Sequence, residues 1–527
     1  MNYTYTLPGL VENAALQFPD KPAFRYLDKT LTYRELAQKM NQLANLLIEL
    51  GVQKGDRVGI FMLRSLETAV AMYGIMQAGA VYVPVNPSQP KARTLFLLKD
   101  CGIQHIVTNT AQNRTLIQLV DNQSFVSTII GTTADLPTQT IPWEAVSQMP
   151  DSSPQINILE QDLAYILYTS GSTGTPKGII HTHYSGLSYA RLSIEAYQLR
   201  ASDIFGNHAP IYFDISTLGY FAAPMVGATT VIASEAHIKM PASLAQLIEK
   251  EAITIWYSVP LALVQLMQGG VLETVSIRQL RWIIFAGEAF PTKHLRKLMT
   301  ICPHARFSNA YGPTETNVCT YYNLPEIPET DDPISIGKPW GNTSILIVNQ
   351  KNESVKTGEA GELLVRSATL MEGYWGRSDL NRKAFFQQEN AAGSPVNFYK
   401  TGDLVREEKD GNLTFLGRKD RQVKTRGFRV ELDEISTFLM RNDAVEEAAV
   451  YTVVNEAEEV LIESAVILKE EKTATSEELL NYLKSYLPAY ALPHAIILTD
   501  NFPRTPTGKM DLRAFQRKDF EQQTTPK

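Results

Sequence analysis

Apolar residues early in the chain recur with the spacing of an α-helix. From Leu36 to Leu50 they follow at steps of four and three, which places them on one helical face. Thr32 and Glu35 precede this run in the Thr-x-x-Glu pattern of a capping box, and Gly51 follows it as a stop. The pattern therefore predicts a helix that begins after Thr32 and ends before Gly51.

Short apolar runs between helical segments predict buried strands. A second helix is expected over 65–77, before Gly79. The strands are expected within 57–62, 81–84, 105–107, 163–168, 253–258 and 281–288. Strands that alternate with helices form mostly parallel sheets covered on both faces. Ligands bind such sheets beyond the carboxyl ends of the strands, so residues 287–289 and 309–315 are expected at one rim.

The chain changes character in its last third. Residues 333–417 contain β-rich runs separated by turns, which predicts a small β subdomain. A densely charged stretch over 417–427 has the composition of a domain boundary. The sequence therefore predicts an N-terminal domain over 1–419 and a C-terminal α+β domain over 420–527. The C-terminal elements are expected as helices at 432–440 and 476–486 and strands near 447–453, 461–468 and 494–498.

Composition and charge exclude several classes of protein. A chain of 527 residues is too long for one hydrophobic core, and 44% hydrophobic with 20% charged residues is ordinary for a soluble protein. A net charge of −7 argues against nucleic acid or an anionic membrane as partner. The separated Cys101, Cys302 and Cys319 predict reduced core residues rather than a zinc site or disulfides. With no signal-peptide pattern and no apolar run of membrane-spanning length, a cytoplasmic protein is expected.

One stretch combines groups that suit a polyphosphate. Residues 168–178, Tyr-Thr-Ser-Gly-Ser-Thr-Gly-Thr-Pro-Lys-Gly, directly follow an expected strand. Glycines let the backbone approach a ligand closely, and N–H groups, hydroxyls and a lysine suit phosphates. The spacing is not that of a Walker A loop, because Pro176 lies between Thr175 and Lys177. Taken alone, the stretch also fits a surface loop of turn-forming residues.

Five motifs in order resemble those of the adenylate-forming superfamily, and within it the adenylation enzymes of nonribosomal peptide assembly. They are the glycine loop, Tyr311-Gly-Pro-Thr-Glu315, Tyr399-Lys-Thr-Gly-Asp403, residues 417–427 and Pro506-Thr-Gly-Lys509. The resemblance implies an α/β fold: a large N-terminal domain of parallel-rich sheets with a β subdomain, and a small α+β C-terminal domain that rotates between two half-reactions. These are activation of a carboxylate with Mg-ATP and transfer of the acyl group to a thiol.

The resemblance also implies a set of ATP-binding residues. Those in the glycine loop are Thr169, Ser170, Gly171, Ser172, Thr173, Gly174 and Lys177. The others are Gly287, Glu288, Ala289, Asn309, Ala310, Tyr311, Gly312, Asp403 and Arg418. In this set Asn309 is expected to read the adenine edge and Tyr311 to stack on the adenine ring. Asp403, helped by Arg418, is expected to bind the ribose hydroxyls.

Catalytic and metal-binding roles follow from the same resemblance. Lys509 matches a lysine that bridges the substrate carboxylate and the α-phosphate, and Thr314 matches a phosphate contact. Lys424 is expected to enter the site for thiol transfer. Glu315 matches the Mg²⁺ ligand, a hard oxygen donor for a hard cation. Cations are needed because attack on the α-phosphate concentrates negative charge. Taken singly, Lys509 also fits a solvated lysine.

The implied substrate pocket favours a small apolar amino acid. Asp214, in Phe-Asp-x-Ser, resembles the aspartate that holds the substrate α-ammonium in amino-acid-activating members. The other pocket positions carry no charge: Ile215, Leu218, Tyr257, Ile284, Ala286, Ala310, Val318 and Cys319. Tyr257 fills space that a large side chain would need, and a polar side chain would be left unpaired.

This pocket set, with Lys509, resembles that of the free-standing prolyl–carrier-protein ligases of pyrrole-antibiotic and anatoxin biosynthesis. L-proline is therefore the expected substrate, with phenylalanine or another small apolar amino acid as alternatives. Only 18 residues follow Lys509, fewer than a carrier domain needs, so the expected acceptor is the phosphopantetheine thiol of a separate carrier protein.

Three other functions fit less well. An acyl-CoA ligase has no use for Asp214, and a D-alanine–carrier ligase suits the pocket set less than a proline enzyme does. A non-catalytic nucleotide-binding scaffold would have no need of Glu315, Asp403 and Lys509 together.

Overall fold

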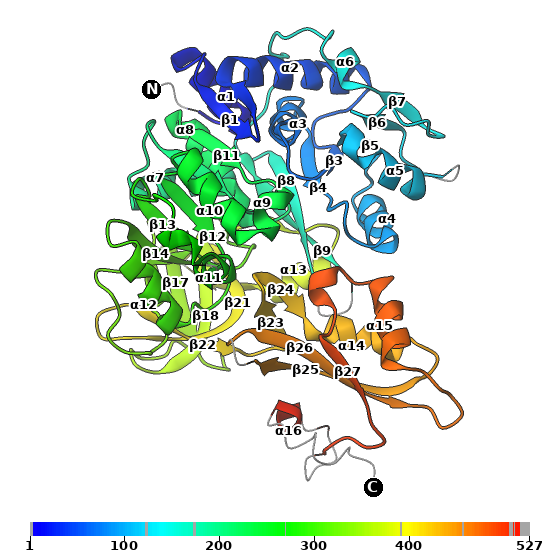
Figure 1. The fold of residues 1–527 in the computed structure, drawn as a ribbon, viewed down its shortest axis with the longest axis vertical. Coiled ribbons are helices and arrows are strands. Elements are labelled where there is room, and N and C mark those ends of the chain that lie inside the picture. The colour runs from blue at the N-terminus through cyan, green and yellow to red at the C-terminus, as the bar shows by residue number, and fades with distance from the viewer. Residues whose placement is uncertain are drawn as a thin grey trace. The chain divides into compact units, whose positions relative to one another are not determined.

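The computed structural model describes residues 4–121, 125–171, 175–268, 270–389, 393–455, 458–504, 510 and 512–516. These residues form two compact units (Figure 1). The first contains the described residues up to 87, then 98–168 and 178–419, and the second contains 88–97, 169–177 and the described residues from 420 onward. The expectation that residues 420–527 move as a separate domain stays a prediction.

The first unit contains a nine-stranded sheet in the order β16-β15-β14-β13-β12-β10-β11-β1-β2. Its strands are β1 (Pro22–Tyr26), β2 (Lys29–Thr32), β10 (Ile204–Asn207), β11 (Thr229–Ile232), β12 (Ile255–Ser258), β13 (Trp282–Phe285), β14 (Arg306–Tyr311), β15 (Thr320–Asn323) and β16 (Lys338–Pro339). The six central strands run parallel: β14, β13, β12, β10, β11 and β1. Antiparallel strands lie at both edges, β15 and β16 at one and β2 at the other.

A second sheet has eight strands in the order β19-β9-β8-β4-β3-β5-β6-β7. They are β3 (Arg57–Phe61), β4 (Val81–Pro84), β5 (His105–Thr108), β6 (Thr128–Ile130), β7 (Gln139–Ile141), β8 (Leu163–Thr169), β9 (Lys177–Thr182) and β19 (Gly373–Tyr374). Six neighbouring strands run parallel, as the alternation of helices and strands predicted: β8, β4, β3, β5, β6 and β7.

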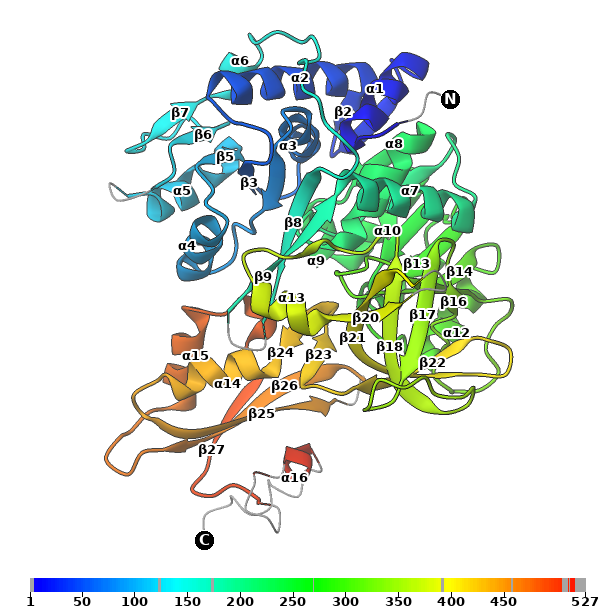
Figure 2. The same ribbon diagram turned by 180° about the vertical axis from the view of Figure 1, so that it is seen from behind.

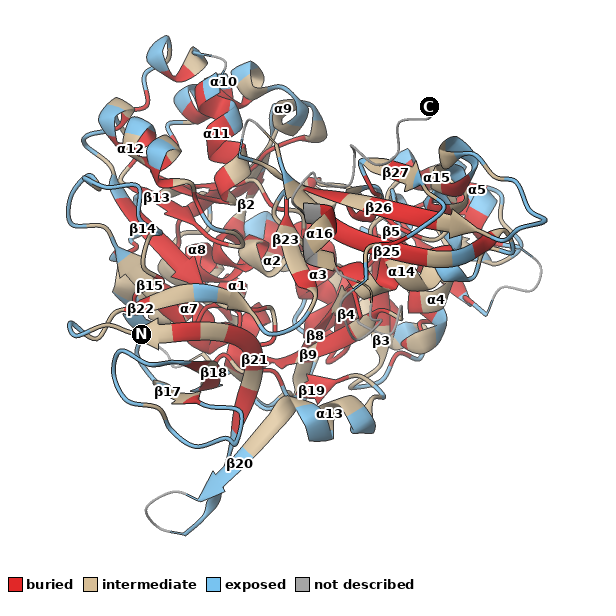
Figure 3. Cartoon of the chain, turned by 90° about the horizontal axis from the view of Figure 1, so that it is seen from below, coloured by how far each residue is buried: buried red, intermediate tan, exposed pale blue. Residues whose placement is uncertain are grey.

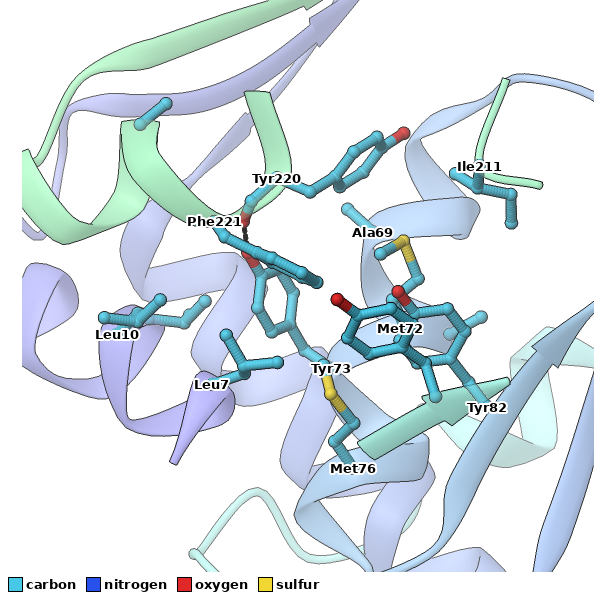
Figure 4. Close-up of a cluster of buried hydrophobic side chains, with 14 of the residues drawn as sticks. Leu7, Leu10, Ala69, Met72, Tyr73, Met76, Tyr82, Ile211, Tyr220 and Phe221 are labelled. Atoms are coloured by element: carbon cyan, nitrogen blue, oxygen red, sulfur yellow. Dashed lines mark hydrogen bonds between the residues drawn. The ribbon is translucent and has the colours of Figure 1, made fainter. Parts of the chain in front are cut away.

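The main core joins the two sheets through helices α1 (Leu7–Gln17), α2 (Tyr33–Glu49), α3 (Leu66–Gln77) and α7 (His183–Tyr197). Helix α2 begins after Thr32 with the predicted capping box in place. In Figure 4, Tyr73 of α3 donates a hydrogen bond to the Tyr220 carbonyl while Phe221 packs nearby. The other helices of this part of the chain are α4 (Lys91–Asp100), α5 (Asn113–Leu119), α6 (Trp143–Val146), α8 (Ala223–Val226), α9 (Glu235–Lys239), α10 (Pro241–Lys250), α11 (Pro260–Gln268), α12 (Thr292–Ile301) and α13 (Ser378–Ala384).

The β subdomain expected within 333–417 is a five-stranded antiparallel sheet (Figure 2). Its strands are β17 (Thr343–Val348), β18 (Ala360–Ser367), β20 (Phe385–Glu389), β21 (Pro395–Glu407) and β22 (Leu413–Arg418). Residues near the end of β20 are exposed, as Figure 3 shows.

The second unit is an α+β structure with its own core. Hairpin β23 (Gln422–Thr425) and β24 (Phe428–Glu431) leads into α14 (Leu432–Met440). The sheet of β25 (Val445–Val454), β26 (Val460–Leu468) and β27 (Ala495–Leu498) packs with α15 (Ser476–Lys484), and α16 (Leu512–Gln516) follows. Residues 88–97 also belong to this unit, and a buried ion pair joins Arg93 to Glu434 over 2.9 Å.

The architecture confirms the α/β class expected from the hydrophobic pattern. Residues 131–160 were not assigned to any element from the sequence; within them β7 adds to the sheet edge and α6 forms a single turn. Pairing with β6 supplies the hydrogen bonds for β7, and the local sequence carries no sign of that partner. No helix in the described ranges is both long and apolar enough to cross a membrane.

Candidate active site

Three adjacent strands bring together four of the expected substrate-pocket residues. Tyr257 on β12 pairs directly with Ile284 on β13. Ala286 directly follows β13, and Ala310 lies on β14. Each is two residues beyond a member of the cross-strand pair Ile284–Ser308, so both return to the same face, because side chains alternate along a strand. All four are buried in the main core, at the carboxyl ends of parallel strands where the ligand rim was expected.

The turn that carries Asp214 follows β10. Residues Asp214–Ser216 form one 3₁₀ turn, and Leu218–Ala222 continue it as a π-helical turn. The Asp214 side chain is half-buried and its Oδ1 accepts a hydrogen bond from the Ile215 N–H over 2.9 Å. Leu218 is buried and Ile215 packs against the main core. Irregular π turns occur often at functional sites, and the sequence carried no sign of this one.

Asp214 lies near three buried tyrosines. Burial raises the pKa of the Tyr165, Tyr189 and Tyr257 phenols. Neighbouring tyrosines and then the Asp214 carboxylate raise the pKa of Tyr189 and Tyr257 further, and Asp214 alone does so for Tyr165. The phenols are therefore neutral at physiological pH, and Asp214 brings a carboxylate into surroundings of aromatic and aliphatic side chains.

The loop that carries Thr314 and Glu315 is fixed through its backbone. The carbonyls of residues 314–316 accept hydrogen bonds from His181 Nε2, the Met371 N–H and Thr369 Oγ1, over 3.0, 2.8 and 2.6 Å. Burial lowers the pKa of His181 to about 4, so the ring is neutral at pH 7 and carries its proton on Nε2. Three successive carbonyl contacts leave this loop little freedom to move.

Glycine is required where this loop closes. A Cβ at Gly312 would lie 2.1 Å from the carbonyl oxygen of Asn317, far inside contact distance. The base of the loop is closed by the Cys319 N–H, which donates to the Tyr311 carbonyl over 2.8 Å. Gly312 therefore contributes by lacking a side chain.

Glu315 is fully buried, and its Oε1 accepts a hydrogen bond from the Tyr374 hydroxyl over 2.8 Å. No cluster of three or more metal-ligating side chains occurs among the residues that the structure describes. A single carboxylate suits Mg²⁺, which commonly takes one or two carboxylates, with substrate phosphates and water as its other ligands. The donor set around Glu315 therefore fits Mg²⁺ bound together with a nucleotide.

Asp403 and Arg418 form a buried pair between β21 and β22, where they are direct cross-strand partners. Arg418 Nη1 lies 2.5 Å from Asp403 Oδ1, and the Tyr311 hydroxyl donates to Asp403 Oδ2. Two carboxylate oxygens offer about four acceptor positions, so Asp403 can also accept from a ribose hydroxyl. Asn309 donates from Nδ2 to the Ser335 carbonyl over 2.9 Å, which leaves its Oδ1 suited to an adenine amino group.

Residues 287–289 have three different surroundings. Gly287 has φ +97°, and a Cβ there would lie 4.0 Å from Ile215 Cδ1, which places its backbone beside the expected substrate residues. Glu288 Oε1 accepts from the Leu261 N–H over 3.2 Å at the start of α11, a helix-capping contact. Ala289 is exposed.

Residues 169–171 and 175–177 of the glycine loop belong to the second unit, whereas Tyr168 and Gly178 belong to the first. Ser170 is buried and donates from Oγ to the Arg429 carbonyl over 2.9 Å. A Cβ at Gly171 would lie 2.0 Å from the Thr175 carbonyl oxygen, so glycine is required in this loop as well. Thr169 ends β8 and Lys177 begins β9.

The hairpin β23–β24, which carries Lys424, is part of the same unit. Burial raises the pKa of Glu431 on β24, and the charges of Arg429 and Lys177 lower it. The glycine loop and the hairpin therefore share a charged neighbourhood. Four predicted residues, Ser172, Thr173, Gly174 and Lys509, lie outside the described residues.

The last two expected substrate positions, Val318 and Cys319, pack in different hydrophobic clusters. Val318 joins the main core with the other pocket residues, whereas Cys319 packs with Tyr311 in a neighbouring cluster. Cys319 Sγ also donates to the Tyr311 carbonyl over 3.5 Å. Cys101, Cys302 and Cys319 are all buried, as expected of core cysteines.

The sequence did not indicate several residues that support this site. Tyr374 contacts Glu315 across 59 positions, and Asn317 contacts Thr217 across 100. Neither pairing follows a local periodicity, so no pattern in the sequence marks it. His181 and His183 are both buried, and His183 lies at the start of α7.

Comparison with known proteins identifies the family. The model of the AMP-binding enzyme family matches residues 11–375, and that of the AMP-binding enzyme C-terminal domain matches 434–509. An L-proline–[L-prolyl-carrier protein] ligase of Pseudomonas fluorescens is 33% identical, over 95% of this chain and 97% of that one. A protein of the same name from Streptomyces coelicolor is also 33% identical, over 96% and 95% of the two chains.

A solved structure shows the same architecture. It is the Vibrio cholerae adenylation domain AlmE in complex with glycyl-adenosine-5′-phosphate, with a TM-score of 0.84 and 25% identity over 99% of each chain. The resemblance and the adenylate-forming fold inferred from the five motifs are thus confirmed. Since a family model covers most of its length, the chain belongs to the AMP-binding enzyme family.

Proposed function

We propose that this protein is an ATP-dependent, AMP-forming ligase that activates L-proline and transfers the prolyl group to the phosphopantetheine thiol of a separate carrier protein. Support comes from the two relatives named as L-proline–[L-prolyl-carrier protein] ligases, which align over nearly their whole length. The alternatives, another small apolar amino acid, phenylalanine or an acyl-CoA ligase, are less favoured.

One observation carries the substrate assignment: the Asp214 carboxylate lies beside the buried, neutral phenols of Tyr165, Tyr189 and Tyr257. Tyr257 and Ile284 are cross-strand neighbours in the same core, and Asp214 acts electrostatically on Tyr257. A carboxylate in apolar surroundings gains much from an ammonium partner. The apolar neighbours suit the three methylene groups of the pyrrolidine ring, and the ring nitrogen is the ammonium that would pair with Asp214, so no polar group of the side chain is left unpaired.

The chemistry requires two displacements. In the first, a proline carboxylate oxygen bonds to the α-phosphorus of ATP, and pyrophosphate leaves. In the second, a thiol sulfur bonds to the acyl carbon, AMP leaves and the thiol proton is released. Lys509 is proposed for the first step and Lys424 for the second, as the motifs imply.

Several groups of residues are proposed to bind the nucleotide. Asp403 and Arg418 would hold the ribose, with Tyr311 and Asn309 at the adenine. Thr314 and the glycine loop, including Ser170 and Lys177, are proposed to bind phosphates. Glu315 would hold Mg²⁺, which when bound offsets the negative charge of the phosphates.

Amino-acid-dependent ATP–pyrophosphate exchange tests the proposal. We expect L-proline to give the dominant signal in a panel with L-phenylalanine, D-alanine, cyclopentanecarboxylate and fatty acids. Asp214→Asn keeps the acceptor for the Ile215 N–H but removes the charge, so exchange with proline should fall roughly 10- to 100-fold in kcat/KM. Exchange only with acids that lack an amine would overturn the proposal.

A second measurement addresses the acceptor. Purified enzyme with L-proline and ATP is offered coenzyme A or a phosphopantetheine-loaded carrier protein, and AMP release is followed with each. We expect transfer to the carrier protein. Efficient transfer to free coenzyme A would restore the acyl-CoA ligase.

A further inference from the structure

Two buried side chains join the turn that carries Asp214 to the loop that carries Glu315. Asn317 Nδ2 donates to Thr217 Oγ1 over 3.1 Å, and Thr217 Oγ1 donates to the Asp214 backbone carbonyl over 2.5 Å. Asn317 is 5% exposed and Thr217 2%, so water does not compete for these hydrogen bonds.

The backbone of Asn317 is held in an unusual conformation. Its φ is +56°, in the left-handed region, where asparagine is tolerated better than most residues. Its N–H donates to the Thr314 carbonyl over 3.3 Å, and its own carbonyl lies against Gly312. The loop therefore fixes the direction in which the Asn317 amide points.

The other end of the link is equally constrained. Ser216 Oγ donates to the Phe213 carbonyl over 2.7 Å, next to the Thr217–Asp214 contact. The buried phenol of Tyr189 also lies close to Thr217, which lowers a pKa that burial and then Tyr197 raise. The Asp214 turn is thus closed by its own side chains and is tied to the 312–318 loop through Asn317.

We propose that Asn317 is a positioning residue for amino-acid recognition, acting through Thr217. The link holds the Asp214 carboxylate at a fixed distance from Thr314 and Glu315. A substrate whose ammonium binds Asp214 then presents its carboxylate toward the nucleotide phosphates. This inference rests on the proposed function and adds a residue that does not itself contact the substrate.

The proposal predicts a selective defect. Without the amide, the Asp214 turn loses its tie to the loop, and the ammonium is held less well. The proposed ribose contact of Asp403 and Arg418 lies on β21 and β22, outside this link. His181 and Met371 hold the backbone of Thr314 and Glu315 without the Asn317 amide, so nucleotide binding should be preserved. A purely structural role would instead affect both substrates together.

The test measures three constants in Asn317→Ala by ATP–pyrophosphate exchange. They are KM for L-proline, KM for ATP, and Ki for cyclopentanecarboxylate, a proline analogue that lacks the amine, as a competitor of proline. We expect KM for proline to rise about tenfold, the cost of one buried hydrogen bond, while the other two constants stay within about twofold. Equal changes in all three constants, or no change in any, would overturn the proposal.

Matched variants separate the side chain from the backbone. Asn317→Gly retains the left-handed conformation without the amide, so it should raise KM for proline as much as Asn317→Ala. A normal KM in the glycine variant would mean that strain, not the hydrogen bond, caused the defect. Asn352 has φ +60° in an exposed turn, and Asn352→Ala should leave all three constants unchanged.

A double-mutant cycle tests whether the two residues act through one bond. Thr217→Val should mimic Asn317→Ala, and Thr217→Ser should retain a low KM because it keeps the hydroxyl. The double variant Asn317→Ala/Thr217→Val should be no worse than either single variant. Additive effects would show independent roles and overturn the link.

Failure of the inference and failure of the proposed function give different results. If the unmodified enzyme activates another amino acid, proline is wrong, and the same constants are measured with that amino acid and its deaminated analogue. If it activates only acids without an amine, both proposals are wrong. If it favours proline and Asn317→Ala keeps the ratio of Ki to KM, only the positioning role is wrong.

Discussion

Three carboxylates of the candidate site have different surroundings and different partners. Asp403 is 2% exposed and is balanced by Arg418, whereas Glu315 is fully buried and receives a hydrogen bond from Tyr374. Asp214 is half-buried beside neutral phenols. These surroundings match three proposed tasks: binding a ribose hydroxyl, a metal ion and an ammonium group.

Glu315→Gln tests the metal-binding role of one residue. The amide oxygen of glutamine can still accept from the Tyr374 hydroxyl, so the melting temperature should change by no more than about 2 °C. Loss of the anionic ligand should reduce ATP–pyrophosphate exchange about 100-fold and raise the Mg²⁺ concentration needed for half-maximal rate. The control is Glu372→Gln, which removes the charge of an exposed carboxylate two residues before Tyr374. An unchanged Mg²⁺ dependence in Glu315→Gln would contradict the assignment.

At the scale of elements, the hairpin loop between β14 and β15 concentrates the proposed nucleotide chemistry. Its residues Thr314 and Glu315 are placed by backbone contacts to His181 and Met371, from elements far away in sequence. The motif Tyr311-Gly-Pro-Thr-Glu315 was recognisable in the sequence. Strand β9 and the segment before β19 hold this loop in place. No local pattern in the sequence indicated that these two segments contact the loop.

Gly312→Ala tests whether this loop tolerates a shift. The added methyl would lie 2.1 Å from the Asn317 carbonyl, and the loop must move to relieve the contact. We expect a stability loss of about 1–3 kcal/mol in urea unfolding, and exchange activity reduced more than about tenfold.

Gly358→Ala provides the matched control for Gly312→Ala. Gly358 has φ +91° with open space around it in an exposed turn, so alanine there costs stability through backbone strain alone. It should lower stability by about 1 kcal/mol with full activity. Comparable loss of activity in both variants would mean that the Gly312 effect is not specific to the loop.

At the scale of the whole molecule, buried neutral histidines connect distant parts of the first unit. His183 is 1% exposed, and its Nδ1 accepts from the Leu7 N–H over 3.1 Å, which ties the start of α1 to the start of α7. Burial lowers the pKa of His183 to about 4, below its ordinary value of 6.5. Protonation would also remove the acceptor that Leu7 uses.

This shift predicts a loss of stability in mild acid. Between pH 6.5 and about 4 the unfolded chain binds a proton at His183 and the folded chain does not, so stability falls as the pH falls. From pH 7 to 5.5 the contribution of one such histidine is about 1 kcal/mol. His183→Asn keeps an acceptor for the Leu7 N–H and does not titrate. Between pH 7 and 5.5 the free energy of urea unfolding should therefore decrease by about 1 kcal/mol less in this variant than in the unmodified protein. Parallel pH profiles for the two proteins would contradict the prediction.

Much of the fold was readable from local pattern. The capping box at Thr32, the glycine stop at Gly51 and the runs that became β3, β4, β8, β12 and β13 all lie where periodicity placed them. Each depends on neighbours within a few residues, so the sequence records it directly. The edge strand β7 was missed, because its stability comes from β6 rather than from its own residues.

The sequence by itself determined the family, the types of residue proposed to carry the chemistry and the order of the motifs. Only the tertiary structure decided which side chains support them: Tyr374 for Glu315, Arg418 and Tyr311 for Asp403, and Asn317 through Thr217 for the Asp214 turn. Local periodicity and motif spacing are properties of neighbouring residues. Contacts between residues up to a hundred positions apart are set by how strands and loops pack, which no short stretch of sequence encodes.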